Sequence, residues 1–315
     1  MSVKRMLPAA PCAALLLALA PAADPPARMI VGAIIDSDRY RAYVGDTVVW
    51  RVFDTAGQAG LVTGFFRITA NGNRIAEVPL SPFSPFLTTF IGYTPYAPGK
   101  YITGVYMFDV NGTTAYQFSP PVIVDPRPAP KNVRVEPVSG TALKVAWDAV
   151  PGATGYEVWR AEFKAGPYAL VRSTAATSWS NTYLTPGKLY WYQVRSTNSV
   201  STIGFNGTAA STLFSAPAGA IPLAKAAITS AAATGKDRVK LVLTPVPGAS
   251  GYEVQVSSTA GGAYRVLRRV SAATFTLTGL NPDTAYYFRV RAYRTVSAGT
   301  FFGPLSGYRG VRTLK

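Results

Sequence analysis

Alternating apolar and polar positions recur along the chain and predict short β-strands. Residues 143–147 (LKVAW) and 190–194 (YWYQV) carry an apolar side chain at every second position, so one face of each strand would meet a core. Glycine and proline separate such runs, as Pro151, Gly152 and Gly155 do just before the strand that begins at Tyr156. The pattern therefore predicts an all-β protein.

A repeat organises the last two thirds of the chain. Residues 150–158 (VPGATGYEV) recur as residues 246–254 (VPGASGYEV), and Tyr252 minus Tyr156 gives an offset of 96. We expect two copies of one unit without net insertion between the landmarks that share this offset. These are Tyr168 and Tyr264, Leu184 and Leu280, Pro186 and Pro282, Tyr190 and Tyr286, Val194 and Val290, and Phe205 and Phe301.

Each copy contains a tyrosine at a characteristic spacing. Leu184-x-Pro186-x-x-x-Tyr190 in the first copy returns around Tyr286 in the second, and the pattern resembles the tyrosine corner of the fibronectin type III family. The resemblance implies two seven-stranded sandwiches, residues 126–220 and 221–315, in which both tyrosine hydroxyls bond to upstream backbone. It also places Trp147 in the core of the first copy. The Arg-Gly-Asp tripeptide of that family is absent, because Val311 follows Arg309-Gly310.

The N-terminal third has a different pattern. Residues 45–48 (GDTV) open a strand, residues 98–101 (PGKY) lead into another that ends near Asp109, and Asn71-Gly72 and Asn111-Gly112 predict hairpin turns. Residues 23–125 resemble a bacterial immunoglobulin-like surface domain. Proline-rich joints follow at residues 125–130 and 215–222. The expected fold is three tandem immunoglobulin-like or fibronectin type III β-sandwiches.

The first 22 residues have the three parts of a secretory signal peptide. Lys4 and Arg5 precede the apolar run at residues 13–20, and small residues favour cleavage after Ala22. The apolar run is shorter than a membrane span, and no later segment is long enough to cross a bilayer. We therefore expect a secreted protein, extracellular or associated with the cell surface.

Composition removes most enzyme classes. The chain has no histidine, and its one cysteine, Cys12, lies in the predicted signal peptide. Catalytic triads, Cys-His pairs and His- or Cys-ligated metals are therefore excluded from the mature chain. Asp36 and Asp38 suggest a weak calcium site, but ordinary turn chemistry is favoured for them. We expect no catalysis, no metal and no cofactor.

The net charge of +16 is unevenly distributed. Residues 23–125 hold 7 basic and 8 acidic side chains (−1), residues 126–220 hold 9 and 4 (+5), and residues 221–315 hold 13 and 3 (+10). A basic domain outside the cell attracts polyanions, here an anionic cell-wall polymer such as teichoic acid, an acidic polysaccharide, a host glycosaminoglycan or extracellular DNA. The alternative is that the positive charge only keeps the protein soluble. No motif indicates specific nucleic-acid recognition. We expect a monomer.

Strand alternation separates candidate surface residues from the core. In the first copy, Trp159, Trp191 and Arg195 are expected to share one exposed face that could stack on sugars or anchor a protein. The alternative is that they only stabilise the sheet. In the second copy, Tyr287, Arg289 and Arg291 form the matching face, Tyr293 and Glu253 lie beside it, and Arg265, Arg268 and Arg269 add charge on an adjoining strand. The alternative for this face is a solvated surface with one Glu–Arg pair.

These features favour a non-catalytic binding or spacer protein at the cell surface or wall, with the basic C-terminal domain holding anionic polymer or glycan. One alternative is an adhesin or matrix component that binds another surface protein through the aromatic faces. Another is an accessory module of a surface carbohydrate-active enzyme. Function inferred from fold class is weak evidence, so the structure of the candidate faces carries more weight.

Overall fold

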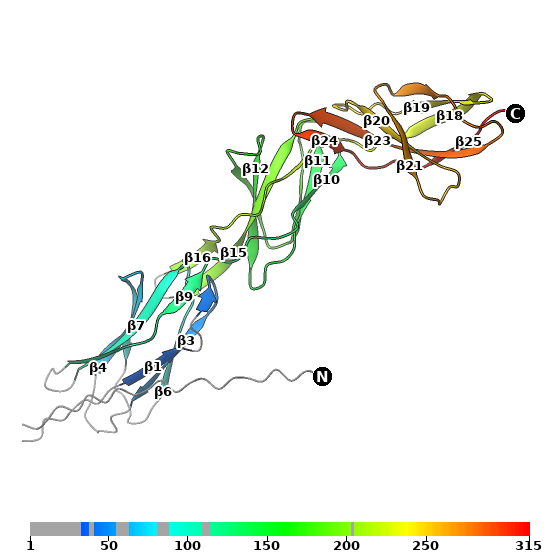
Figure 1. Ribbon diagram of the computed structural model, residues 1–315. Coiled ribbons are helices and arrows are strands. Elements are labelled where there is room, and N and C mark those ends of the chain that lie inside the picture. The colour runs from blue at the N-terminus through cyan, green and yellow to red at the C-terminus, as the bar shows by residue number, and fades with distance from the viewer. Residues whose placement is uncertain (1–32, 38–40, 55–62, 81–87, 109–113, 203–204) are drawn as a thin grey trace, which may run out of the picture.

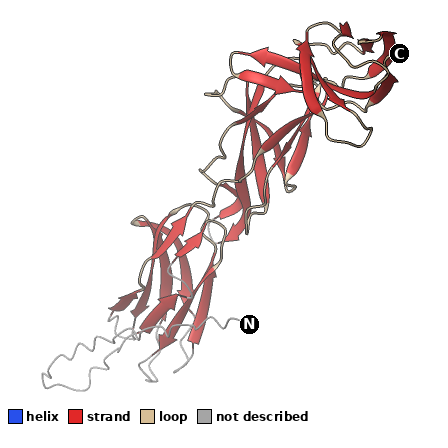
Figure 2. Ribbon diagram, turned by 45° about the vertical axis from the view of Figure 1, so that its right-hand side comes forward, coloured by secondary structure: helices blue, strands red, loops and turns tan. Residues whose placement is uncertain are grey.

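The computed structural model describes residues 33–37, 41–54, 63–80, 88–108, 114–202 and 205–315, and every regular element in these ranges is a strand. Figures 1 and 2 show three β-sandwiches that follow one another in an elongated row. The predicted all-β, tandem-sandwich fold is confirmed. The predicted signal peptide, Asp38 and the Asn111-Gly112 turn lie outside the described residues.

The first sandwich packs a three-stranded sheet on a larger one. The smaller sheet has the order β1 (Ala33–Ser37), β3 (Val48–Asp54), β6 (Thr88–Tyr93). The larger has the order β2 (Arg41–Tyr43), β9 (Val122–Asp125), β7 (Gly99–Phe108), β4 (Thr63–Ala70), β5 (Asn73–Leu80), with β8 (Thr114–Phe118) also paired to β7. Trp50 and Phe66, both fully buried, meet between the sheets.

The predicted Asn71-Gly72 hairpin joins β4 to β5. Both residues have the positive φ angles that such a turn requires, +50° for Asn71 and +85° for Gly72. The Asn71 side chain also accepts a hydrogen bond from the backbone N–H of Lys100 at 3.0 Å, which ties the turn to the start of β7. Asparagine therefore serves both the turn and the neighbouring strand.

The second and third sandwiches have the same topology, as the repeat predicts. In the second, one sheet has the order β10 (Arg134–Ser139), β11 (Ala142–Ala146), β14 (Ser178–Asn181); the other has β13 (Ala169–Thr174), β12 (Gly155–Ala161), β15 (Tyr190–Thr202), β16 (Phe205–Ala210), with β17 (Ala218–Ala220) on β15. In the third, the sheets are β18 (Ile228–Gly235), β19 (Arg238–Leu243), β22 (Thr274–Leu277) and β21 (Arg265–Val270), β20 (Gly251–Ser257), β23 (Ala285–Val296), β24 (Gly299–Phe302), with β25 (Arg309–Arg312) on β23.

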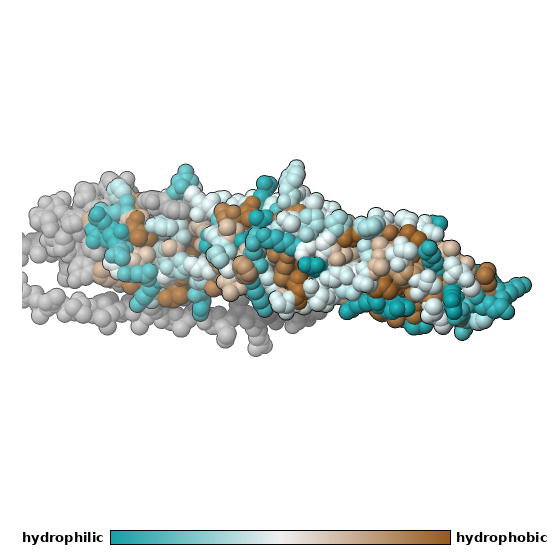
Figure 3. Space-filling model, turned by 90° about the horizontal axis from the view of Figure 1, so that it is seen from above, coloured by the Kyte–Doolittle hydropathy of each residue, from teal (hydrophilic) through white to brown (hydrophobic). Residues whose placement is uncertain are grey.

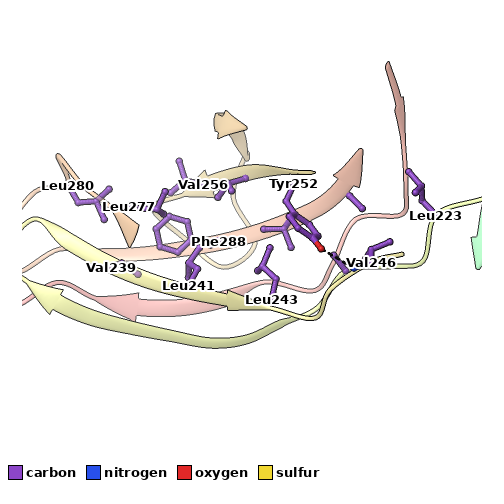
Figure 4. Close-up of a cluster of buried hydrophobic side chains, with 14 of the residues drawn as sticks. Leu223, Val239, Leu241, Leu243, Val246, Tyr252, Val256, Leu277, Leu280 and Phe288 are labelled. Carbon is purple, nitrogen blue, oxygen red and sulfur yellow. Dashed lines mark hydrogen bonds between the residues drawn. The ribbon is translucent and has the colours of Figure 1, made fainter. Parts of the chain in front are cut away.

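The repeated Val-Pro-Gly turn is closed by the tyrosine that follows it. In the third sandwich, the Tyr252 hydroxyl accepts a hydrogen bond from the Val246 N–H at 2.9 Å, within a cluster that includes Leu241 and Phe288 (Figure 4). The matching bond in the second sandwich joins Tyr156 and Val150 at 2.8 Å. One buried hydroxyl thus satisfies a turn N–H in each copy.

The corner tyrosines make the second repeated bond. Tyr190 accepts a hydrogen bond from the Thr185 N–H at 3.2 Å, and Tyr286 accepts one from the Asn281 N–H at 2.9 Å. Trp147 is 3% exposed and packs edge-on against a tyrosine of the same core. These contacts hold the entry to the long strands β15 and β23.

The expected absence of insertions between the copies is wrong beyond Val194 and Val290. The Val194 N–H donates to Ser215, 21 residues on, whereas the Val290 N–H makes the same bond to Ser306, 16 residues on. The second sandwich therefore holds five more residues in this region. Because of these residues, Phe205 and Phe301 are not structurally equivalent. Phe205 pairs with Thr202 at the tip of its hairpin, whereas Phe301 pairs with Arg294.

The longer hairpin of the second sandwich reaches into the first. Val200, on β15, and Ala209, on β16, are 2% and 7% exposed and belong to the hydrophobic core of the first sandwich. Thr202 accepts a hydrogen bond from the backbone of Thr94 at 3.3 Å. The longer hairpin thus provides a contact between the first and second sandwiches.

A buried arginine completes this first joint. Arg127, in the proline-rich linker, is 4% exposed and forms an ion pair with Asp46 of the first sandwich at 2.6 Å. It also donates to the Asn198 side chain at 2.7 Å and to the Pro151 carbonyl at 2.8 Å, both in the second sandwich. Because a buried guanidinium needs several partners to offset its desolvation, these three bonds fix both sandwiches to the linker.

The second joint is a close approach of two glycines. A Cβ on Gly248, in the repeated turn of the third sandwich, would lie 2.6 Å from the Cα of Gly187 in the second. The Gly187 N–H donates to the Pro222 carbonyl of the linker at 3.2 Å. Both joints therefore use the same repeated turn, since Gly152, the counterpart of Gly248, lies against Arg127.

Candidate functional site

The outer face of the second sandwich brings Trp159 and Arg195 together. The Arg195 guanidinium lies beside two rings that meet edge-on, 5.1 Å from the centroid of Trp159 and 5.0 Å from that of Phe214. Glu157 accepts hydrogen bonds from Arg195 at 2.7 Å and from the Trp159 indole at 3.1 Å. All of these side chains are at least partly buried, and their polar groups and rings already contact one another within the cluster.

Trp191 is on the same side of the sheet but has separate partners. Its ring covers Gly219 on β17, where a Cβ would lie 2.8 Å from the indole, and Lys164 lies 5.6 Å from the ring centroid. The tryptophan therefore fills the space that a side chain on β17 would otherwise occupy. Its half-buried position differs from the exposed platform expected from strand alternation.

The outer face of the third sandwich is built around a buried carboxylate. Glu253, on β20, has a side chain 2% exposed and forms ion pairs with Arg269 at 3.1 Å and Arg291 at 2.7 Å. Burial opposes the ionisation of Glu253, but hydrogen bonds from Gln255, Arg269 and Arg291 outweigh it and lower the pKa of this carboxyl. The alternative of a solvated surface with one Glu–Arg pair therefore does not hold at Glu253, because arginines from both neighbouring strands cover this carboxylate.

Aromatic rings complete this layer. Arg291 lies 3.8 Å from the centroid of Phe302, and Arg269 lies 5.1 Å from the same ring and 5.5 Å from that of Tyr293. Arg289 stacks on Tyr264 at 4.3 Å and donates to Gln255 at 2.7 Å. Stacking and hydrogen bonding thus hold the three guanidiniums against the sheet.

Tyr287 repeats the arrangement of Trp191. It lies over Gly310, where a Cβ would approach its ring to 3.0 Å, and meets Tyr308 edge-on at 5.8 Å between centroids. The two copies thus share an aromatic residue that covers a glycine on the last strand of the sheet. Packing accounts for both aromatic positions.

The three arginines predicted on the adjoining strand do not share one face. Arg269 pairs in register with Glu253 and joins the outer layer, whereas Arg268 and Arg265 pair with Val254 and Val256, which face the core. Arg265 and Arg268 therefore project from the other side of β21, at the sheet edge, where both are exposed. Figure 3 shows hydrophilic side chains along the whole described length of this face, and at its C-terminal end they lie among apolar ones.

Several residues of these clusters escaped the sequence analysis. Phe214 and Tyr264 complete the stacks from loops, where alternation gives no orientation, and Phe302 does so from the end of the short strand β24. Gln255 could have been found, because it follows Glu253 at the spacing of the same strand face.

Tyr183 is a further exposed aromatic residue that sequence reasoning missed. It is 98% exposed and holds a φ of +59°, a region that disfavours residues with a Cβ. Gly279 occupies the corresponding position of the third sandwich with a φ of +76°. The offset of 96 aligns the two residues and could have revealed the exception.

A groove of about 700 Å³ lies between residues 128–133 and 213–218 of the second sandwich. Its lining is mostly proline, alanine and other uncharged residues, with Lys131 as the one charged residue in the lining. The groove therefore offers no pair of titratable groups for acid–base chemistry.

The described residues contain neither a candidate metal cluster nor a candidate membrane-spanning helix. Among them, no three acidic, histidine or cysteine residues gather closely enough to hold a metal ion. In the same ranges there is no helix of the length and apolar character that a bilayer crossing requires. The two residues of the calcium interpretation are not described at this level, because Asp38 and the side chain of Asp36 lie outside the described part of the structure.

The second and third sandwiches share one topology and the same pair of tyrosine hydrogen bonds. Residues 232–307 match the family model described as "Fibronectin type III domain". The resemblance seen in the sequence is thereby confirmed for the third sandwich, and its internal repeat extends the same topology to the second.

Relatives of this chain include three bacterial proteins. It is 28% identical over 190 residues to Exoglucanase B of Cellulomonas fimi, 27% over 181 residues to Chitinase A1 of Niallia circulans, and 29% over 168 residues to Endoglucanase B of Cellulomonas fimi. These matches cover 59%, 55% and 49% of this chain but only 16%, 24% and 15% of the relatives. The chain thus spans less than a quarter of each relative's length.

Two solved structures also match at low similarity. The FN1–FN3 domains of chicken CNTN1 align with 89% of this chain and 97% of that one, at 17% identity and a TM-score of 0.30. A two-domain fibronectin type III segment of chicken tenascin aligns with 58% of this chain and 99% of that one, at 15% identity and a TM-score of 0.33.

Proposed function

We propose that the protein is a non-catalytic extracellular spacer whose basic third domain binds an anionic cell-wall polymer or polysaccharide. The observation that carries the proposal is the charge of that domain. Residues 221–315 hold 13 basic and 3 acidic side chains, and all three acids, Asp237, Glu253 and Asp283, are in ion pairs with arginines of the same domain. The excess positive charge is therefore left for an external polyanion.

The spacer part of the proposal is supported by the two joints. A linker arginine with three partners fixes the first joint, and a glycine contact too close for side chains fixes the second. Close packing at both joints favours an extended rod over freely hinged domains. Such a rod would hold the third domain at a set distance from the first.

The setting is suggested by the relatives, which are named as two glucanases and a chitinase. We infer from these names that the present protein acts in an extracellular environment rich in polysaccharide. The alternative of an accessory module within a larger surface enzyme fits the small share of those relatives that the chain covers. An adhesin acting through aromatic faces is less well supported, because Trp159 and Trp191 already pack against residues of their own domain.

Sedimentation with purified bacterial cell walls tests the proposal. The full chain is mixed with walls that retain or lack their anionic polymer, at salt from about 50 mM to about 500 mM, a range over which the Debye length shortens about threefold. We expect binding that requires the polymer and falls at least tenfold across the series. Failure to bind at the lowest salt, or binding that ignores salt, would overturn the polyanion proposal.

A further inference from the structure

We propose that Arg265 and Arg268, on the edge strand β21, form the contact for an acidic polysaccharide. This inference rests on the proposed function and names the part of the third domain that performs it. Both arginines are exposed. Neither forms an ion pair with an acid in the described part of the chain, unlike Arg269 and Arg291.

A β-bulge brings the two arginines to the same side of the strand. Residues three apart on a regular strand point to opposite faces. Here the register shifts between Val254 and Gln255, so that Arg268 pairs with Val254 and Arg265 pairs with Val256. Leu267 is the additional residue. The paired valines are two residues apart, which places the two arginine positions about 7 Å apart along the edge.

The arginines of the outer layer are poorer candidates. Arg269 and Arg291 neutralise Glu253, and Arg289 is bound to Gln255 and stacked on Tyr264. A ligand that engaged these guanidiniums would have to compete with an internal carboxylate or disrupt the stack. A ligand of Arg265 and Arg268 would face no such competition, because both side chains are exposed and form no ion pair among the described residues.

The sheet edge itself adds donors. β21 is the last strand in its sheet and pairs with β20 on one side only. Every second peptide N–H of such a strand points away from the sheet and lacks a ladder partner. Guanidinium forks and peptide N–H groups in one line suit an extended chain that carries carboxylate or sulfate groups.

The surroundings favour a polysaccharide over a single-stranded nucleic acid. Single strands are bound by aromatic platforms on which the bases stack. The nearest aromatic along the chain, Tyr264, is occupied by Arg289, and the residues between the two arginines, Val266 and Leu267, are aliphatic. A ligand held by charge and edge hydrogen bonds, without stacking, fits this strip.

A charge-matched pair of variants tests the inference in the full chain. R265Q/R268Q removes two charges from the edge, and K236Q/R309Q removes two exposed charges elsewhere in the same domain. Binding of heparin, used as the acidic polysaccharide probe, and of a single-stranded thymidine oligonucleotide is measured by fluorescence anisotropy across a salt series. Hydrogen exchange of β20 checks that both variants remain folded.

We expect R265Q/R268Q to weaken heparin binding about tenfold or more and to reduce the salt slope by about two, as loss of two ionic contacts requires. K236Q/R309Q should change affinity by less than about threefold, because only the general field is lowered. Equal losses in both variants would overturn the edge site and leave the proposed function intact. Absence of heparin binding by the unmodified protein would overturn both the edge site and the proposed polyanion-binding function. Oligonucleotide binding that is as tight as heparin binding and equally sensitive to R265Q/R268Q would overturn the ligand class.

Discussion

At the residue scale, Glu253 shows how an outward-facing position becomes buried. Alternation along β20 directs its side chain away from the core, yet it is 2% exposed because Arg269 and Arg291 close over it from the strands on either side. Glu157, its counterpart in the second sandwich, is 16% exposed and has one arginine partner. The third sandwich therefore differs from the second by an additional arginine partner, and the two arginines together cover the Glu253 carboxylate.

Replacing this carboxylate tests its contribution to stability. E253Q leaves two guanidiniums without their ion-pair partner, and we expect the third sandwich to lose about 2 kcal/mol of unfolding free energy at neutral pH. Hydrogen exchange of β20 and β23 is the suitable measurement, because all five tryptophans lie before residue 192. D237N, which removes an exposed acid of the same domain, should cost less than about 1 kcal/mol. Equal effects of the two variants would show that Glu253 acts only through net charge.

The pH dependence follows from the lowered pKa of Glu253. A carboxyl whose pKa is lower in the folded than in the unfolded state stabilises the fold above its ordinary value, and that contribution is lost as pH falls through the folded-state pKa. The unmodified third sandwich should therefore lose stability below about pH 4.5, the ordinary value of the carboxyl. E253Q should lose less over the same interval. Parallel stability curves for the two proteins below that pH would contradict the assignment.

At the scale of elements, the hairpin of β15 and β16 links two domains. Its outer half adds Val200 and Ala209 to a core that is otherwise formed by strands of the first sandwich. The corresponding hairpin of the third sandwich is shorter. An insertion within one strand pair therefore determines how the second sandwich packs on its neighbour.

V200A should destabilise the sandwich that does not contain it. Val200 is 2% exposed, and removing two methyl groups from a buried position lowers the free energy of unfolding by about 2 kcal/mol. We therefore expect faster hydrogen exchange in β4 and β7 of the first sandwich. V138A, at a 55% exposed position of the second sandwich, is the matched control and should leave exchange unchanged. If V200A accelerates exchange only within residues 126–220, the hairpin does not stabilise the first core.

At the scale of the whole molecule, shape depends on the two joints. The repeated Val-Pro-Gly turn lies at the N-terminal end of both repeat domains and meets a different surface each time, Arg127 at the first joint and Gly187 at the second. One local motif therefore serves both contacts, because its glycine leaves room for close approach of either a guanidinium or another backbone.

G248A should loosen the second joint. The added methyl group would lie 2.6 Å from Gly187 Cα, so the two sandwiches must separate or tilt. Small-angle scattering should then show a broader range of overall dimensions than for the unmodified chain. G279A is the matched control, because Gly279 has a nearly identical φ of +76° but no atom within 4 Å of its Cβ position. Equal scattering changes in both variants would attribute the effect to backbone strain.

Local patterns in the sequence were sufficient for the strands, the repeat and much of the core. Alternation placed Tyr192 and Val194 inward, and both are fully buried. The family resemblance around Tyr190 and Tyr286 implied hydroxyl bonds to upstream backbone, and the structure contains them. These features depend on residues close together in the chain, where strand geometry alone determines which side chains share a face.

The tertiary structure alone decided which charged side chains remain available. Alternation could not show that Glu253 is covered, that a bulge at Leu267 aligns Arg265 with Arg268, or that Val200 lies in another domain's core. These features depend on segments that are separate in the chain: Arg291 is 38 residues from Glu253, and the core that holds Val200 consists, apart from Val200 and Ala209, of buried residues between Ala42 and Val124. Hydrophobic patterning therefore determined the strands of this protein, whereas cross-strand register and domain packing determined its surface, because both arise only when separate segments meet.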